Sequence, residues 1–392
     1  MCQYRLIHSM LVCMLILCSV SCVSSRDTET IVELTVEQLK LDNNYLFRQI
    51  ENVHPDIRAY IDEERYTKIQ EYVRKQCIQP LTLQQFHNTV KIALDHLEEG
   101  HTFVHSPLGS TPSEQRESAQ TQLNQLLAAD TLSQNSYKLL ENPKTCIFRY
   151  NHCGLPREIS KYDQCISKMF AEIRKNNVQD LIIDVRNNGG GFSGTNDLLI
   201  RYFADKPFRQ YEKVFKRLTP QASAFYNTIG MEYMPYLHKA YDTTSLTLDP
   251  NGMPIQKDFT VQARFVSPVK KPLRFSGRVS VLIGRGTYSS AMLFASTVQH
   301  YKFATLIGEE TLRFDRQHYG DVVFISLPHS QLTIQVSTAI FTTMRSDSKS
   351  GTGIIPDYKV AQKKSDTKKK VDTVDAYVLN LVMNQAESEI SR

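Results

Sequence analysis

The segment Asp184 to Gly191, with the sequence DVRNNGGG, constrains the fold of this chain more than any other stretch. It follows the apolar run Leu181-Ile182-Ile183, which indicates a buried strand. Glycines at the end of a strand permit positive φ, and their unobstructed N–H groups can bind an oxygen that becomes negatively charged. A tight strand-to-helix turn without a chemical role has the same glycines. Neither a GxGxxG sequence nor a Walker lysine follows, which disfavours a nucleotide site.

A serine follows the next strand-like run. Val279 to Gly284 predicts a strand, and the chain then leads through Tyr288 into Ser289 and Ser290, where an apolar helical pattern begins. The free N–H groups and the dipole of a first helical turn favour negative charge, so Ser289 is a candidate nucleophile. A serine that only caps the helix would occupy the same position. No GxSxG sequence surrounds it, which argues against an α/β-hydrolase.

A histidine supplies a third element. The segment Glu99 to Val104 places His101 just past a helical pattern. A neutral imidazole with a pKa of about 6.5 suits a general base, although a purely structural histidine fits the same position. The histidine, Ser289 and the glycines lie on three separate loops and together offer a base, a nucleophile and oxyanion donors. This combination is typical of serine peptidases.

Length and charge narrow the class of protein. A chain of 392 residues exceeds what one core usually serves, so two or three structural units are expected. The net charge is only +5. Five lysines cluster near the C-terminus without the interleaved aromatic residues of nucleic-acid surfaces, so we interpret them as a solvated connector and predict no nucleic-acid partner. They are Lys363, Lys364, Lys368, Lys369 and Lys370.

The N-terminus has the features of an export signal. Arg5 and His8 precede an apolar run from Met10 to Val20, which has the length of a signal-peptide core and is too short to span a membrane comfortably. Small residues precede Cys22, as at a bacterial lipoprotein cleavage site, so lipidation of Cys22 is expected. The expected location is the bacterial cell envelope, periplasmic or membrane-anchored. An ordinary cleaved signal peptide is the alternative.

Four cysteines remain after this leader. They are Cys77, Cys146, Cys153 and Cys165. Their spacing fits no zinc motif, so no metal site is predicted. One disulfide among the last three, or small buried thiols, are both compatible with an oxidising compartment.

The apolar spacing divides the chain into successive units. The predicted units are a lipoprotein-like signal peptide (1–22), a helical N-terminal domain (28–105), a linker with a short helix (106–142), an α/β catalytic domain (143–360), and a basic connector with a C-terminal helix (361–392). Thr82 is placed to cap the last N-terminal helix. A β-α-β succession from Pro143 onward indicates a mainly parallel sheet. Residues Thr219 to Asp258 are irregular and are expected to cover the active face.

Together these segments resemble the tail-specific, or C-terminal-processing, serine peptidase family in its tricorn-core-like branch. The matching motifs follow the family's order and cover most of the mature chain. They are Val53-His54-Pro55, Gly100-His101-Thr102, DVRNNGGG, GTYSSAMLFAS, Leu306-Ile307-Gly308-Glu309-Glu310-Thr311 and Gly353-Ile354-Ile355-Pro356-Asp357. The resemblance implies a ClpP/crotonase-like α/β core behind a small helical unit, a polypeptide substrate and no cofactor.

The resemblance also implies a role for each candidate residue. Ser289 matches the nucleophile of the family, and Gly190 or Gly191, with the N–H of Ser290, would bind the oxyanion. His101 matches the histidine that one branch uses as its base. An acyl-enzyme mechanism with a Ser-His pair follows.

The other branch of the family uses a lysine as its base. Phe314 stands at that place in this chain. Its neighbours Arg313 and Arg316 stay protonated and cannot act as a base.

This sequence departs from the family pattern at two acidic positions. Met292 and Ile355 stand there, so the residue that orients His101 is not identified, although Glu309 and Glu310 are available carboxylates. Too few residues lie between His101 and the strand at Cys146 for a PDZ module of about a hundred residues, which many relatives use to capture substrate tails. Substrate choice is therefore expected to lie in the helical unit and the irregular segment.

Two rival functions fit the same scaffold. A binding protein would hold a peptide or an apolar ligand without turnover, because a fold does not fix a function. The missing acidic partner favours that rival, whereas the presence of Ser289, His101 and the glycines together favours an enzyme. An esterase would use the same residues. The oligomeric state stays open.

Overall fold

The computed structural model describes residues 33–59, 61–107, 111–114, 130–220, 222–224, 239–250, 253–345 and 351–390. These residues all belong to one compact unit, Val32–Arg392. The predicted signal peptide, the lipidation site Cys22 and the short helix expected near residues 119–129 lie outside the described residues.

Three capped helices begin the described chain. They are α1 (Val36–Val53), α2 (Glu63–Gln76) and α3 (Leu83–Asp95). The Thr82 hydroxyl accepts the N–H of Gln85 at 3.2 Å, and the Gln85 side chain accepts the N–H of Thr82 at 2.8 Å. This capping box satisfies two donors at the start of α3, so the prediction of Thr82 as the cap is confirmed. A small antiparallel pair, β1 (Glu33–Leu34) with β2 (Leu81–Thr82), joins α1 to α3.

A mainly parallel sheet forms the centre of the second half of the chain. Its strands, in spatial order, are β14 (Tyr358–Lys359), β11 (Thr305–Gly308), β10 (Arg278–Ile283), β6 (Asp180–Asp184), β5 (Thr145–Arg149) and β4 (Ser136–Leu140). Every neighbouring pair is parallel except β4 with β5. The expectation of an α/β fold with a mainly parallel sheet behind a helical unit is confirmed.

The edge strand β4 lies inside the segment 106–142 that the sequence predicts as a linker. The linker prediction is therefore wrong for residues 136–140. The strand has the sequence SYKLL, and all of its side chains are exposed or half-buried. A strand that pairs on one side needs no continuous apolar run, so its sequence lacks the pattern that identifies a buried strand.

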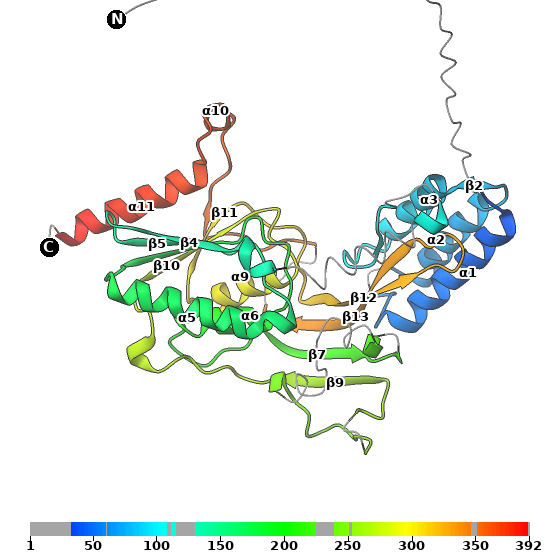
Figure 1. The fold of residues 1–392 in the computed structure, drawn as a ribbon, viewed down its shortest axis with the longest axis horizontal. Coiled ribbons are helices and arrows are strands. Elements are labelled where there is room, and N and C mark those ends of the chain that lie inside the picture. The colour runs from blue at the N-terminus through cyan, green and yellow to red at the C-terminus, as the bar shows by residue number, and fades with distance from the viewer. Residues whose placement is uncertain are drawn as a thin grey trace, which may run out of the picture. The chain divides into compact units, whose positions relative to one another are not determined.

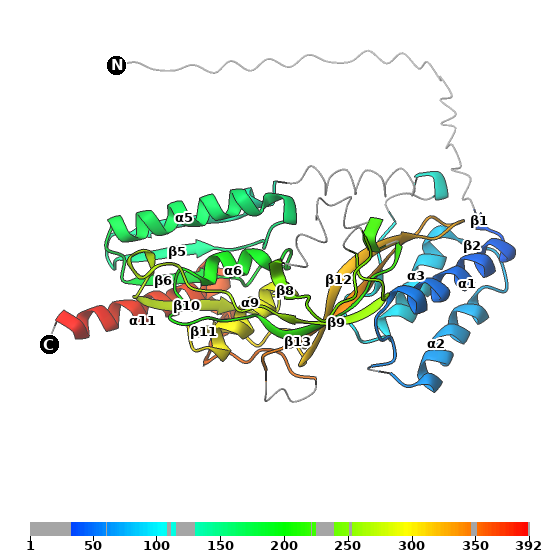
Figure 2. The same cartoon turned by 90° about the horizontal axis from the view of Figure 1, so that it is seen from below.

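Helices cover both faces of the parallel sheet. They are α5 (Ile159–Lys175), α6 (Gly194–Ile200), α9 (Ser290–His300) and α11 (Thr373–Ile390). Ile182 and Leu282 point to the face that packs against Val374 and Val378 of α11, whereas the residues on either side of them enter the core shared with α5 and α9. This alternation is the period of two that a strand imposes. Figures 1 and 2 show α5 and α11 on opposite sides of the sheet.

The second sheet is antiparallel, and the sequence does not predict it as a unit. Its strands, in spatial order, are β12 (Gln317–Ser326), β13 (Thr333–Thr343), β7 (Tyr211–Arg217), β9 (Asp258–Ala263) and β8 (Tyr241–Asp242). The apolar runs Val322–Ile325 and Leu332–Val336 predict short strands, and the structure has the longer β12 around the first and β13 from the second residue of the other onward. Strand β7 has the sequence YEKVFKR, in which charged residues alternate with apolar ones, so no apolar run marks it.

Strand β3 (Phe103–Val104) connects the helical segment to this second sheet. It pairs with β13 through Val104 opposite Ile334 and Phe103 opposite Gln335. The Gln335 side chain also donates to the carbonyl of His101 at 2.9 Å. The antiparallel sheet thereby fixes the backbone of the loop that carries the candidate base.

The sequence left open whether the cysteines form a disulfide or remain thiols. All four cysteines of the described chain are free thiols, and Cys77, Cys146 and Cys153 are buried. Burial raises the pKa of Cys146 and of Cys153 to about 12, which makes them poor nucleophiles.

Among the described helices, none is long and apolar enough to cross a membrane.

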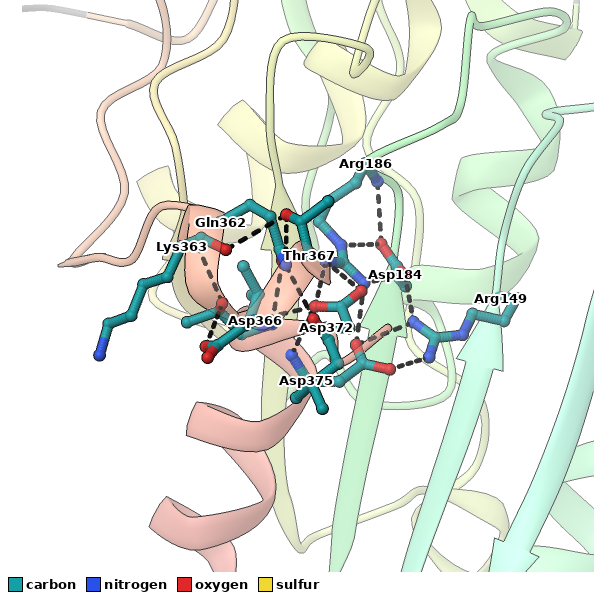
Figure 3. Close-up of polar contacts among 12 residues, drawn as sticks. Arg149, Asp184, Arg186, Gln362, Lys363, Asp366, Thr367, Asp372 and Asp375 are labelled. Atoms are coloured by element: carbon teal, nitrogen blue, oxygen red, sulfur yellow. Dashed lines mark hydrogen bonds and ion pairs between the residues drawn. The ribbon is translucent and has the colours of Figure 1, made fainter. Parts of the chain in front are cut away.

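The C-terminal helix is attached to the strand that leads to DVRNNGGG by a network of ion pairs (Figure 3). The buried Asp184, at the end of β6, pairs with Arg186 at 2.8 Å and with Arg149 of β5. Asp375, in the first turn of α11, pairs with both arginines, and Asp372 pairs with Arg186 at 2.9 Å. Burial alone would raise the pKa of Asp184, but the hydrogen bonds and charge of Arg186 outweigh it and lower the pKa.

We expect Asp375→Asn to lower the free energy of unfolding by about 1 to 3 kcal/mol, because hydrogen bonds to charged groups contribute about this much and both arginines lose a carboxylate. Urea denaturation at neutral pH measures the change. The matched control is Asp163→Asn on the exposed side of α5, which should change the free energy by less than about 0.5 kcal/mol. Equal effects of the two variants would contradict a stabilising role for the network.

Candidate active site

Ser289 occupies a strained turn between β10 and α9. Its φ of 52° and ψ of −122° form a backbone conformation that residues with a side chain rarely adopt. Such a conformation costs about 1 to 3 kcal/mol and persists only where the surrounding structure imposes it. Ser289 is the N-cap residue of α9, yet within the described chain its hydroxyl makes no capping hydrogen bond. The hydroxyl faces another partner instead.

That partner is His101. Its Nε2 lies 3.1 Å from the Oγ of Ser289, although 188 positions separate the two residues in the sequence. His101 is only 6% exposed. Burial lowers the pKa of its imidazole, and the negative charge of Glu99 raises it in part. The ring is therefore neutral at neutral pH, which is the state that can accept a proton.

Tyr288 fixes the orientation of this imidazole. Its ring stacks on the ring of His101, with centroids 4.9 Å apart. The Tyr288 hydroxyl donates to the carbonyl of Gly100 at 2.6 Å and lies 3.4 Å from Nδ1 of His101. Since the hydroxyl proton is already donated, its oxygen can only accept from Nδ1. The hydrogen-bond pattern thus assigns the proton to Nδ1 and leaves Nε2 free to accept from Ser289.

Glu99 is a buried carboxylate that holds the histidine loop. It accepts the backbone N–H of His101 at 3.0 Å and also that of Thr102, and the hydroxyl of Ser337 donates to it. The Nε2 of His54 lies 3.8 Å away. Burial alone would raise the pKa of Glu99, but His54, the charge of His101 and Ser337 outweigh it and lower the pKa to about 2. Glu99 is therefore ionised, and its charge stabilises a protonated His101.

The glycine turn lies against the serine turn. A Cβ on Gly190, whose φ is +108°, would come within 2.8 Å of the Ser289 Cβ. The N–H of Gly190 is donated to the Asn188 side chain at 2.8 Å. Within the described residues, the N–H groups of Gly191 and Ser290 have no hydrogen-bond partner. Of the predicted oxyanion donors, these two are available, whereas Gly190 is already engaged.

Two side-chain amides that the sequence does not single out hold the glycine turn and the serine turn in place. The Asn188 amide donates to the carbonyl of Tyr150 at 2.8 Å, and Asn196 of α6 donates to the carbonyl of Ser290 at 2.8 Å. Both asparagines are fully buried. Asn188 lies within DVRNNGGG, and its position directly before consecutive glycines is the signal by which the sequence could have revealed it. Nothing in the sequence around Asn196 marks it.

Neither Glu309 nor Glu310, the two carboxylates that the sequence offers, makes a described hydrogen bond to His101. Met292 is fully buried in the first turn of α9, and Ile355 is exposed. Glu310 accepts the N–H of Gly353 at 3.0 Å and has a structural role there. Glu309 is exposed. The described residues that act on the His101 imidazole are Tyr288, by hydrogen bonding, and Glu99, by charge.

A cavity of about 450 Å³ opens beside His101. Its walls include Tyr288, Leu312, Arg313 and His318. Phe314, which stands where one branch of the family has a lysine, is buried behind it against His318, with ring centroids 4.8 Å apart. No lysine lines the described part of this cavity, so His101 is the base candidate next to Ser289.

The model of peptidase family S41 matches residues 154–360, more than half of the chain. The chain belongs to peptidase family S41. The resemblance to this serine peptidase family is thereby confirmed, and family membership supports a serine peptidase with a polypeptide substrate.

Solved structures agree with the fold of this S41 peptidase. A putative peptidase from Parabacteroides merdae ATCC 43184 is 18% identical, with a TM-score of 0.53 over 87% of this chain and 96% of that one. Mature CPAF is 11% identical, with a TM-score of 0.54 over 89% of this chain and 97% of that one. At these identities the likeness concerns the fold alone. No curated protein sequence matches the S41 chain significantly.

We expect Gly190→Ala to slow labelling of the serine by a fluorophosphonate about a hundredfold, because the new methyl group would displace Ser289 and small misplacements cost about that much. The control is Gly189→Ala, whose Cβ would meet no atom within 4 Å, and its labelling rate should change less than about twofold. Equal rates for the two variants would disprove the packing of Gly190 against the nucleophile.

Glu99→Gln tests the buried charge through the pH dependence of stability. Because folding lowers the pKa of Glu99 from 4.5 to about 2, its ionised form stabilises the protein above pH 4.5, and the contribution disappears as the pH falls towards 2. We expect the variant to lose roughly 3 kcal/mol at pH 7 and progressively less below pH 4.5, measured by urea denaturation.

Glu309→Gln, at an exposed position, is the control for this experiment and should change the free energy of unfolding little at any pH. A stability loss in Glu99→Gln that stays constant between pH 7 and pH 3 would show that Glu99 is not ionised in the folded protein.

Proposed function

We propose that this chain is an exported serine endopeptidase that cleaves polypeptides through a Ser-His acyl-enzyme mechanism. The observation that carries the proposal is the 3.1 Å contact between Nε2 of His101 and Oγ of Ser289. A buried histidine has no structural need to contact a serine held in a strained turn. The two groups meet as a base and a nucleophile do.

In the proposed reaction, Oγ of Ser289 attacks the peptide carbonyl carbon while its proton moves to Nε2 of His101. The N–H groups of Gly191 and Ser290 stabilise the negatively charged oxygen, and the N-terminus of α9 adds its dipole. One such donor contributes about 3 to 4 kcal/mol. The imidazolium then protonates the leaving amine, and water hydrolyses the acyl-enzyme by the reverse sequence of proton transfers.

Export through the apolar leader, lipidation at Cys22 and a location in the bacterial cell envelope belong to the same proposal. Their support is the leader sequence alone. The absence of charged residues between Met10 and Val20 and the small residues before Cys22 are the features that carry it.

Labelling of the purified protein by a fluorophosphonate probe tests the mechanism. We expect labelling of the wild type, none in Ser289→Ala, and a loss of about a hundredfold or more in His101→Ala. Ser290→Ala, which removes only a hydroxyl bonded to the carbonyl of Gly191, should still be labelled. Since burial lowers the pKa of His101, the labelling rate should fall only below about pH 6.5.

A folded wild type that stays unlabelled between pH 5 and pH 9, about two units on either side of the usual pKa of histidine, would contradict the Ser-His mechanism and favour a binding protein on this scaffold. Faster hydrolysis of short acyl esters than of unfolded polypeptides would favour the esterase.

A further inference from the structure

A second cavity, of about 260 Å³, adjoins the residues that follow the glycine turn. Its lining includes Phe192 and Ser193, the two residues that follow Gly191 in the chain. The remaining walls come from α6, from the start of β7 and from β9. Because Phe192 is one residue from a candidate oxyanion donor, and consecutive Cα atoms are about 3.8 Å apart, a peptide bound at Ser289 has this cavity within reach.

Basic side chains dominate the cavity. Arg201, Arg209 and Arg264 all line it, together with Lys239. Each arginine makes a hydrogen bond to a backbone carbonyl: Arg201 to Ser267, Arg209 to Ala263 and Arg264 to Tyr241. Within the described residues none of the three forms an ion pair with a carboxylate. Of the three, Arg201 and Arg209 are half-buried and Arg264 is exposed. Two half-buried guanidinium groups without an ion pair among the described residues are unusual, since charged groups removed from water are normally paired.

Arg209 is the most constrained of the three. Its Nε is buried and has no hydrogen-bond partner within the part of the chain that the structure describes. Its guanidinium lies over the ring of Phe265, 4.8 Å from the centroid, which fixes the plane of the group. A planar guanidinium with unused donors matches the two oxygens of a carboxylate.

One carboxylate, Asp197, also lines the cavity. Gln210 donates to it at 2.8 Å, and burial raises its pKa to about 7 despite the nearby charges of Arg201 and Lys239. At neutral pH it is therefore only partly ionised. A single, partly ionised carboxylate leaves the cavity with a net positive charge, and this carboxylate already accepts a hydrogen bond from Gln210.

Gln210 connects this cavity to the reaction site. Its amide nitrogen donates to the carbonyl of Ser193 at 2.8 Å, and its oxygen accepts from Asn196 at 2.9 Å. Asn196 in turn donates to the carbonyl of Ser290. The cavity and the nucleophile turn are thus parts of one buried hydrogen-bonded frame.

We propose that this basic cavity binds a carboxylate of the polypeptide substrate, with Arg209 as the main recognition group and Arg201 and Arg264 completing the positive field. The inference rests on the proposed peptidase function and adds a substrate class to it: polypeptides with an acidic group a few residues from the scissile bond. The carboxylate comes either from an acidic side chain or from the free C-terminus, and the experiment separates the two.

The test measures binding of four fluorescent twelve-residue peptides to the full-length Ser289→Ala protein by anisotropy, so that no turnover occurs. The peptides share one sequence and combine a central glutamate or glutamine with a free or amidated C-terminus. We expect a peptide with the recognised carboxylate to bind about tenfold more tightly than its uncharged counterpart, since a charge-assisted pair contributes about this much. A difference in affinity between the glutamate and glutamine peptides identifies a side-chain carboxylate, and a difference between the free and amidated peptides identifies the C-terminal carboxylate.

Adding Arg209→Gln should reduce this preference to less than about twofold. Arg74→Gln, on the exposed face of α2, removes the same charge elsewhere and should leave the preference intact, which separates recognition from general attraction. If Arg209→Gln does not fold, as judged by its thermal unfolding, Arg264→Gln at an exposed position takes its place. Equal binding of all four peptides, or equal effects of Arg74→Gln and the cavity variant, would overturn the proposal.

Fluorophosphonate labelling of the parent protein keeps the two proposals apart. A labelled parent whose Ser289→Ala form binds none of the peptides overturns the cavity proposal alone. An unlabelled parent whose Ser289→Ala form prefers the acidic peptides, with loss of that preference in Arg209→Gln, overturns the peptidase mechanism and supports the cavity as a peptide-binding site.

Discussion

The parallel pairing of β6 with β10 is the constraint on which the site depends. Its register sets Leu181 beside Val279 and Asp184 beside Leu282, so both strands end at the same edge of the sheet. The glycine turn and the serine turn therefore begin side by side. Three hydrogen bonds then join them: Tyr288 N–H to the carbonyl of Asn188, the Thr287 hydroxyl to that of Val185, and the Ser290 hydroxyl to that of Gly191. This frame stabilises the strained backbone of Ser289.

The histidine reaches this edge through a different sheet. Strand β3 pairs with β13, and the buried Glu99 binds two successive N–H groups of the loop between α3 and β3. A carboxylate buried without partners would cost several kcal/mol; here backbone donors and the hydroxyl of Ser337 satisfy it. The same charge that orders the loop also favours a protonated His101. One buried anion thus contributes to stability and to the chemistry.

The sequence predicted the strands that are buried on both faces and the turns that follow them, because apolar runs and glycines leave a local signature. It failed for β4 and β7, whose exposed or alternating side chains resemble those of loops. Ser289 and His101 were found from their motifs, and the structure brings them together. Glu99 is part of the segment that drew attention to His101, but its role depends on the backbone conformation of its neighbours. Such a role cannot be derived from residue type.

The proposed mechanism does not require a carboxylate hydrogen-bonded to the imidazole of His101. In Ser-His-Asp triads, replacing the aspartate by asparagine costs about ten-thousandfold, chiefly because the imidazole takes the wrong tautomer. Here the hydroxyl of Tyr288 can only accept from Nδ1, so the tautomer is correct without a carboxylate in contact. Burial raises the pKa of Tyr288, which keeps the phenol neutral. The charge that stabilises the imidazolium comes separately from Glu99. In the proposed Ser-His mechanism, the two tasks of the third triad residue, orientation and charge, are therefore divided between Tyr288 and Glu99, and Tyr288 directly precedes Ser289.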